Sequence, residues 1–258
     1  KVESDSKLIL ENITLRNLSG EKIHCVDDTG TIVLSNVVGI LDDAFTFSQG
    51  AISFQNKNRL SGPYNFNYQS IMTSTIKQEG RLKLDSSITF SYDLINDPYK
   101  INPIHFVDET SKLILDRASL VATGSGIELV NGTIRVQRAS YIASDSFLGV
   151  FNQQGIVFGN GVDDCIIEIQ AESQLTLKAG ILAYKNKLSD SLIMLNALSS
   201  IVIAQDATLK IFEPLDVRPG FVVFEDGAKL FTPLEESKKI IGSVEPRGAI
   251  IKNRFVLG

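Results

Sequence analysis

One structural slot recurs along the whole chain, and it constrains the fold more than any other feature. Ile23-His24-Cys25-Val26-Asp27-Asp28-Thr29-Gly30 has a near copy in Ile104-His105-Phe106-Val107-Asp108-Glu109-Thr110-Ser111. In each copy an apolar residue is followed by a polar stretch, a glycine or serine, and then alternating apolar residues. Alternation with a period of two predicts a strand with one buried face, and a small residue before it predicts a tight corner.

Ten strand starts follow this rule. They lie about 20 to 30 residues apart, a period typical of stacked repeats. The starts are Leu8, Ile32, Ile52, Leu82, Leu113, Ile134, Ile156, Leu175, Ile201 and Leu230. This spacing is too short for a helix and two strands in each unit, but it suits two or three strands in each coil of a solenoid. The sequence therefore predicts an all-β fold, a right-handed parallel β-helix (β-solenoid) of about ten coils. An antiparallel sandwich remains the alternative, because Asn131-Gly132 and Asn160-Gly161 could form hairpin turns.

The repeat sets the expected domain organisation. We expect residues 1–232 to form the parallel β-helix. We expect residues 233–258 to form a short helix or a final coil that could lead into a further domain. The ten coils resemble those of the pectin-lyase-like class of β-helices and those of the passenger regions of bacterial surface proteins. This resemblance rests on periodicity, so it implies a fold and no particular family.

Charge and composition limit the kinds of partner. The net charge of −5 disfavours nucleic acid, whose phosphates an acidic chain repels. The chain has no run of 18 apolar residues, so we expect no membrane insertion. The only two cysteines, Cys25 and Cys165, are far apart and cannot form a metal site by themselves. We expect no metal and no cofactor.

The resemblance implies that polysaccharide cleavage must be considered, since many pectin-lyase-like proteins cleave or bind polysaccharides. The paired carboxylates are Asp27-Asp28, Asp42-Asp43, Asp108-Glu109, Asp163-Asp164 and Glu225-Asp226. Such pairs can supply a general acid and base, but Asp is also favoured in turns. We interpret those that precede a corner glycine or serine as turn residues. The two histidines, His24 and His105, occupy equivalent repeat positions and are expected to point outward.

Two of the longer repeats contain tyrosine-rich stretches that we expect to be exposed loops. Tyrosine rings beside Asn and Asp suit a sugar-binding surface or a protein interface. The predicted binding residues are Tyr64, Asn65, Phe66, Asn67, Tyr68, Tyr92, Asp97 and Tyr99. The alternative is that these rings only cover a flank of the coil stack.

The sequence favours a non-enzymatic structural or adhesion β-helix of a cell surface or a phage, outside the cell and bacterial in origin. Its partner would be a surface polysaccharide or a protein. The alternative is a polysaccharide lyase or glycoside hydrolase on the same scaffold. Acidic side chains from neighbouring coils on one face would favour the enzyme.

Overall fold

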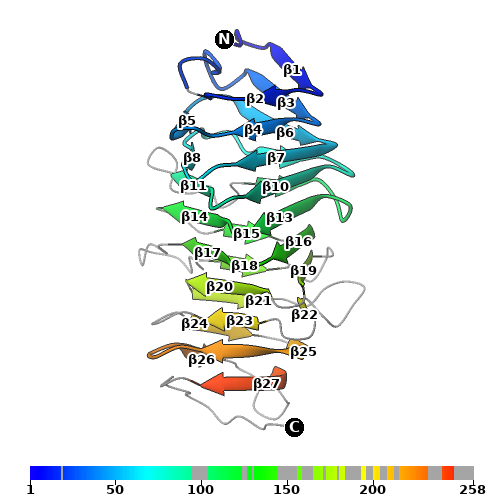
Figure 1. Cartoon of the computed structure of the whole chain (residues 1–258), viewed down its shortest axis with the longest axis vertical. Helices are drawn as coiled ribbons and strands as arrows, with labels where there is room; N and C mark the ends of the chain where they lie inside the picture. Colours follow the sequence, from blue (N-terminus) through cyan, green and yellow to red (C-terminus); the bar gives the residue numbers. More distant parts are fainter. Residues whose placement is uncertain are drawn as a thin grey trace.

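Every regular element of the described residues is a β-strand, and the strands stack in parallel layers between the two chain ends (Figure 1). The computed structural model describes residues 1–18, 20–93, 104–123, 127–129, 131–144, 156–158, 165–170, 173–178, 180–183, 193–195, 200–203, 208–211, 215–231 and 240–246. All strand pairs between neighbouring layers are parallel, so the prediction of an all-β parallel solenoid is confirmed and the sandwich is excluded.

The strands form four sheets, which we name I to IV. Sheet I contains β1 (Lys7–Glu11), β3 (Thr31–Ser35), β6 (Ala51–Gln55), β9 (Ser74–Ile76) and β12 (Ile104–Phe106). Sheet II contains β2 (Thr14–Leu15), β4 (Val38–Ile40), β7 (Lys57–Ser61), β10 (Arg81–Asp85), β13 (Lys112–Asp116), β16 (Gly132–Gln137), β19 (Cys165–Ile169) and β22 (Ile193–Leu195).

Sheet III contains β5 (Phe45–Phe47), β8 (Asn65–Tyr68), β11 (Thr89–Asp93), β14 (Ser119–Thr123), β17 (Ser140–Ser144), β20 (Gln174–Lys178), β23 (Ser200–Ile203), β25 (Leu215–Phe224) and β27 (Ile240–Pro246). Sheet IV contains β15 (Ile127–Leu129), β18 (Ile156–Phe158), β21 (Gly180–Ala183), β24 (Thr208–Ile211) and β26 (Lys229–Phe231). In chain order, sheet IV takes the place of sheet I after β12. A complete coil therefore passes through sheet I or IV, then II, then III.

The coil count differs from the expected one. All ten predicted starts lie in strands, but these strands belong to four different sheets. Sheet I contains Leu8, Ile32 and Ile52, and sheet II contains Leu82, Leu113 and Ile134. Sheet III contains Leu175 and Ile201, and sheet IV contains Ile156 and Leu230. Ile156 and Leu175 even belong to one coil, on β18 and β20. Within the described residues the sheets stack five, eight, nine and five strands, so no single sheet runs through ten layers. The reason is physical: a corner followed by a strand occurs at each side of a coil, and the rule fits any of them.

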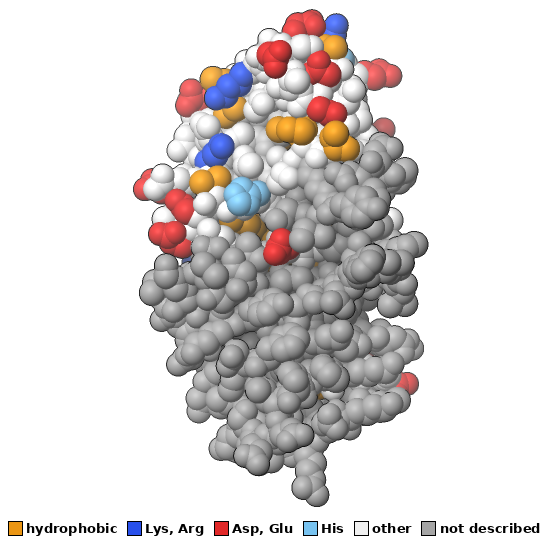
Figure 2. All heavy atoms as spheres, turned by 180° about the vertical axis from the view of Figure 1, so that it is seen from behind, with side chains coloured by type: hydrophobic (Ala, Val, Ile, Leu, Met, Phe, Trp, Pro, Cys, Tyr) orange, Lys and Arg blue, Asp and Glu red, His pale blue; other side chains and the backbone are white. Residues whose placement is uncertain are grey.

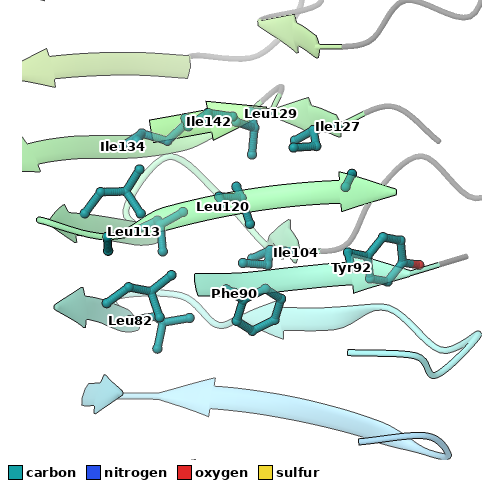
Figure 3. Packing of buried hydrophobic residues seen from close by; sticks show 14 of the residues in the cluster. Leu82, Phe90, Tyr92, Ile104, Leu113, Leu120, Ile127, Leu129, Ile134 and Ile142 are labelled. Atoms are coloured by element: carbon teal, nitrogen blue, oxygen red, sulfur yellow. The ribbon is translucent and has the colours of Figure 1, made fainter. Parts of the chain in front are cut away.

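The core is a set of axial columns in which equivalent residues of successive coils contact each other. Leu82, Leu113 and Ile134 pair in register in sheet II, and all three are fully buried (Figure 3). Phe90, Leu120 and Ile142 form a second column from sheet III. Burial of such a column stabilises each coil only against its neighbours, which is why the stack is cooperative along its axis.

Small residues turn the chain at the corners, as predicted. Before sheet I the carbonyls of Ser6 and Gly30 accept hydrogen bonds from the amides of Thr31 and Ala51, at 3.0 Å each. Gly50 has φ of 79°, and a Cβ there would lie 2.5 Å from the Gly30 oxygen, so only glycine fits. Between sheets I and II, Asn12, Asn36 and Asn56 all have φ near 55°, a conformation that asparagine tolerates.

Candidate functional site

The described parts of the two tyrosine-rich stretches extend into strands, which corrects the prediction that Tyr68 and Tyr92 lie in exposed loops. Residues 65–68 form β8 and residues 89–93 form β11, on the third side of their coils. Phe66, Tyr68 and Tyr92 are almost completely buried, with exposed fractions of 3%, 0% and 0%. Alternation explains the burial: in Asn65-Phe66-Asn67-Tyr68 every second residue is aromatic and points into the core.

The buried rings form two stacked ladders along the axis. The ring centroids of Phe45 and Phe66 are 4.9 Å apart, and those of Phe66 and Phe90 are 5.1 Å apart. Tyr68 lies 5.5 Å from Phe47 and 5.7 Å from Tyr92. These separations are favourable for aromatic pairs, so the rings serve the core.

What remains of the predicted binding set is small. The Tyr64 ring is 40% exposed, Asn65 is exposed, and Asn67 is half-buried. Asn67 accepts a hydrogen bond from the Ser91 hydroxyl at 2.8 Å and donates to the Thr46 hydroxyl at 3.4 Å. Asp97 and Tyr99 lie outside the described residues. Tyr64, Asn65 and Asn67 therefore contribute polar surface but no cluster of exposed rings.

A groove hollows the outer face of sheet I. Its volume is about 380 Å³, and it crosses β1, β3 and β6 to reach β9. Hydroxyl and amide side chains predominate in its lining, with two lysines and one aspartate. These residues are Asp5, Lys7, Thr29, Thr31, Ser53, Gln55, Thr73, Thr75 and Lys77. The register places Val33, Ser53 and Thr75 in one outward column.

Ser53 is the unusual residue of this groove. Ser53 is 5% exposed, and its hydroxyl oxygen is buried without a hydrogen-bond partner. A buried hydroxyl without a partner costs free energy. The Ser53 hydroxyl oxygen has almost no exposed surface, so it lies beneath the groove surface and is not presented to solvent.

The outer face of sheet II carries a network of ion pairs. Asp85 and Asp116 occupy neighbouring coils in register, and both carboxylates are buried. Arg59 Nε lies 2.7 Å from Asp85, and Lys83 Nζ lies 2.7 Å from Asp116. Arg138 also donates to Asp116. Farther along, Arg135 binds Glu168 at 2.7 Å.

This stacked carboxylate pair is the arrangement that would favour an enzyme, but its environment does not suit acid and base catalysis. Burial by itself would raise the pKa of Asp116, yet the hydrogen bonds from Arg138 and Lys83 outweigh it and lower that pKa. A general acid needs a raised pKa instead. Each carboxylate also has cationic partners, Arg59 for Asp85 and Lys83 and Arg138 for Asp116. We assign Asp85 and Asp116 a structural role.

Two of the paired carboxylates are turn residues, as the sequence suggested. Asp27 Oδ1 accepts hydrogen bonds from the backbone amide and the hydroxyl of Thr29, at 2.9 Å and 2.7 Å. Asp108 does the same with Thr110, at 2.9 Å and 2.6 Å. The hydrogen bond from Ser4, followed by those from Thr29, lowers the pKa of Asp27, and those from Thr110 lower the pKa of Asp108.

The histidines agree with the prediction only in part. His105 is exposed on β12, as expected, and its β9 partner is Thr75. His24 is half-buried, and its Nδ1 is buried without a hydrogen-bond partner. The two corners that follow them have the same hydrogen bonds, yet one leads into sheet I and the other into sheet II. The sequence similarity therefore reflects a shared corner.

Sequence reasoning missed the groove and the charged face. Both had a signal, namely polar residues at alternate positions within the predicted strands. Thr31, Ser53 and Thr75 alternate with core residues, as do the charges in Arg81-Leu82-Lys83-Leu84-Asp85. What the sequence lacked was the register that brings these residues of different coils together.

Comparison with known proteins adds no family. No protein-family model, no curated protein and no solved structure matches this chain. Within the described ranges, no three His, Cys, Asp or Glu side chains gather where they could hold a metal ion. Of the described segments, none is a helix with the length and apolar character that a bilayer crossing requires.

Proposed function

We propose that this protein is a non-enzymatic β-solenoid of a bacterial cell or phage surface that binds carbohydrate through the groove of sheet I. The observation that supports the proposal most is the lining of the groove. Its hydroxyl, amide and charged side chains come from four successive coils, on β1, β3, β6 and beside β9. A polysaccharide chain that lies along the axis could contact all four layers at once.

The chemistry of the groove suits sugars. Sugar hydroxyls both donate and accept hydrogen bonds, and Thr31, Thr75 and Gln55 can do the same. Lys7 and Lys77 add cationic donors to the same lining. The strands fix these groups in position, so little conformational entropy is lost on binding.

The experiment is a glycan array followed by titration of the bound glycans. Thr75→Tyr should fill the groove and weaken binding by about ten-fold, because a bulky ring displaces the ligand. Thr89→Tyr, on the outer side of β11, is the matched control and should bind as the unaltered protein does. Equal binding by both variants would show that the groove is not the site.

The same preparations test the enzymatic alternative. We expect no release of reducing ends or unsaturated products from a panel of polysaccharides. Activity that disappears in Asp116→Asn or Asp85→Asn would overturn the non-enzymatic proposal, because these carboxylates would then be catalytic.

A further inference from the structure

Three cations stand directly above one another on the outer face of sheet II. Lys57 of β7 pairs in register with Arg81 of β10, which pairs with Lys112 of β13. Their side chains point outward, because Asn58, Leu82 and Leu113, the next residues of the strands, are buried. Neighbouring strands are about 4.8 Å apart, so the three charges span about 10 Å along the axis. We call this set the cation column.

None of the described carboxylates forms an ion pair with the cation column. The carboxylates of sheet II, Asp85, Asp116 and Glu168, are engaged by Arg59, Lys83, Arg138 and Arg135. Among the described residues, no ion pair joins Lys57, Arg81 or Lys112 to a carboxylate. Burial and then the charges of Arg135 and Arg81 lower the pKa of Lys112, as expected for repelling neighbours.

Like charges that face each other across neighbouring strands destabilise a sheet. A bound anion would remove this cost. On the part of the face in Figure 2 that is coloured, acidic side chains are more prominent than basic ones. The column is therefore a local positive site on a chain whose net charge is −5.

We infer that the cation column binds the anionic groups of an acidic polysaccharide. This inference rests on the proposed function and specifies its ligand. Carboxylate or sulfate groups recur along such a chain, as the cations recur along the column. The groove is adjacent, since Gln55 lines it and only the Asn56 corner separates Gln55 from Lys57. A chain in the groove can thus place its charges on the column. Nucleic acid is also a polyanion, so single-stranded DNA is included among the ligands of the test.

The test compares two triple variants that each remove three positive charges. The first combines Lys57→Gln, Arg81→Gln and Lys112→Gln. The control combines Lys1→Gln, Arg16→Gln and Lys22→Gln, which lie outside the column. Binding to polygalacturonate, dextran sulfate, neutral dextran and single-stranded DNA is titrated at low and high salt, with inorganic sulfate as a competitor.

We expect the unaltered protein and the control to bind an acidic polysaccharide with similar affinity, and the column variant to bind about ten-fold more weakly. Added salt should weaken the binding of the acidic polysaccharide. Binding of neutral dextran should be the same in the column variant and in the unaltered protein. The melting temperature of the column variant should equal or exceed that of the unaltered protein, which separates lost binding from unfolding.

Equal losses in both triple variants, or equal binding of DNA and acidic polysaccharide, would overturn the inference. So would displacement of the polysaccharide by low concentrations of inorganic sulfate, which would indicate a site for small anions only. If neutral glycans bind through the groove while acidic ones do not bind, the inference fails and the proposed function stands. If no glycan binds at all, both fail.

Discussion

Leu113 shows how the position of one residue in a strand decides its role. It lies between Leu82 and Ile134 in the core, with no exposed surface, whereas its neighbour Lys112 points outward. Leu113→Ala should lower the free energy of unfolding by about 2–5 kcal/mol, because it removes buried methyl groups and leaves a cavity. Chemical denaturation measures this. Ile9→Ala, at a position that is 56% exposed, is the control and should have a small effect. Similar effects of both changes would place Leu113 outside the core.

Tyr68 is the residue for which the sequence misled most. Its ring is buried between Phe47 and Tyr92, and its hydroxyl donates to the Met72 carbonyl at 2.5 Å. Tyr68→Ala should cost about 3–5 kcal/mol of unfolding free energy, by analogy with other buried aromatic residues. Tyr68→Phe should cost only about 1 kcal/mol, the contribution of one hydrogen bond. Tyr64→Ala, on the exposed corner, should leave thermal stability nearly unchanged. Unchanged stability in Tyr68→Ala would restore the predicted binding role.

The same ring makes stability depend on alkaline pH. Burial raises the pKa of the Tyr68 hydroxyl above its usual value. The neutral hydroxyl is thus favoured in the folded state, and its contribution is complete below about pH 10, where the unfolded tyrosine titrates. It is lost as the pH rises further. Denaturation between neutral pH and pH 11 should show a decline that is smaller in Tyr68→Phe. The same decline in both proteins would show that other groups cause it.

Single elements divide into what the sequence could and could not predict. Strand existence was predictable, because alternating runs such as Leu82-Lys83-Leu84 and Ile134-Arg135-Val136 leave little choice. The small corner residues were predictable because a glycine or serine precedes most of these alternating runs. The side of the coil on which each strand lies was not, because every corner resembles the others. The Asp85 and Asp116 network was also hidden, since it depends on pairing of β10 with β13.

The sheet II network should support stability over a defined range of pH. The pKa of Asp116 is lowered, since hydrogen bonds from Arg138 and Lys83 outweigh burial. Its contribution is therefore complete above the ordinary aspartate pKa of about 4 and is lost as the pH falls below it. Asp116→Asn should reduce the unfolding free energy at pH 7 by roughly 1–3 kcal/mol, limited by the partial exposure of its partners. It should also flatten the acid dependence. Asp226→Asn, at an exposed turn, is the control, and an equal effect there would contradict a specific network.

The corners before sheet I should differ in their tolerance of side chains. Gly50 has φ of 79°, and an added Cβ would meet the Gly30 oxygen at 2.5 Å. Gly50→Ala should therefore lower the melting temperature by several degrees, about 1 kcal/mol or more in free energy. Ser6→Ala, at the equivalent corner of the first coil, should change it little. Tolerance of alanine at Gly50 would show that the chain does not make this tight turn.

For the molecule as a whole, the axial stack explains why the proposed binding surfaces are repetitive. Successive coils add layers to the groove of sheet I, from β1 to β9, and to the charged face of sheet II, from β7 to β19, so ligands with a repeating structure match these surfaces. The sequence predicted the stack because its period persists over most of the chain. It could not predict the surfaces, because outward residues are not constrained by packing and become a site only when the layers are in register.

The central claim is that successive coils pair in parallel and in register, and methyl NMR tests it most directly. In protein with labelled Ile, Leu and Val methyl groups, we expect contacts between Leu82 and Leu113, Leu113 and Ile134, and Ile134 and Ile167, which form one column of four coils. Leu84 should likewise contact Leu115. Crossed contacts, from Leu82 to Leu115 and from Leu84 to Leu113 without the direct ones, would indicate antiparallel pairing and contradict the solenoid.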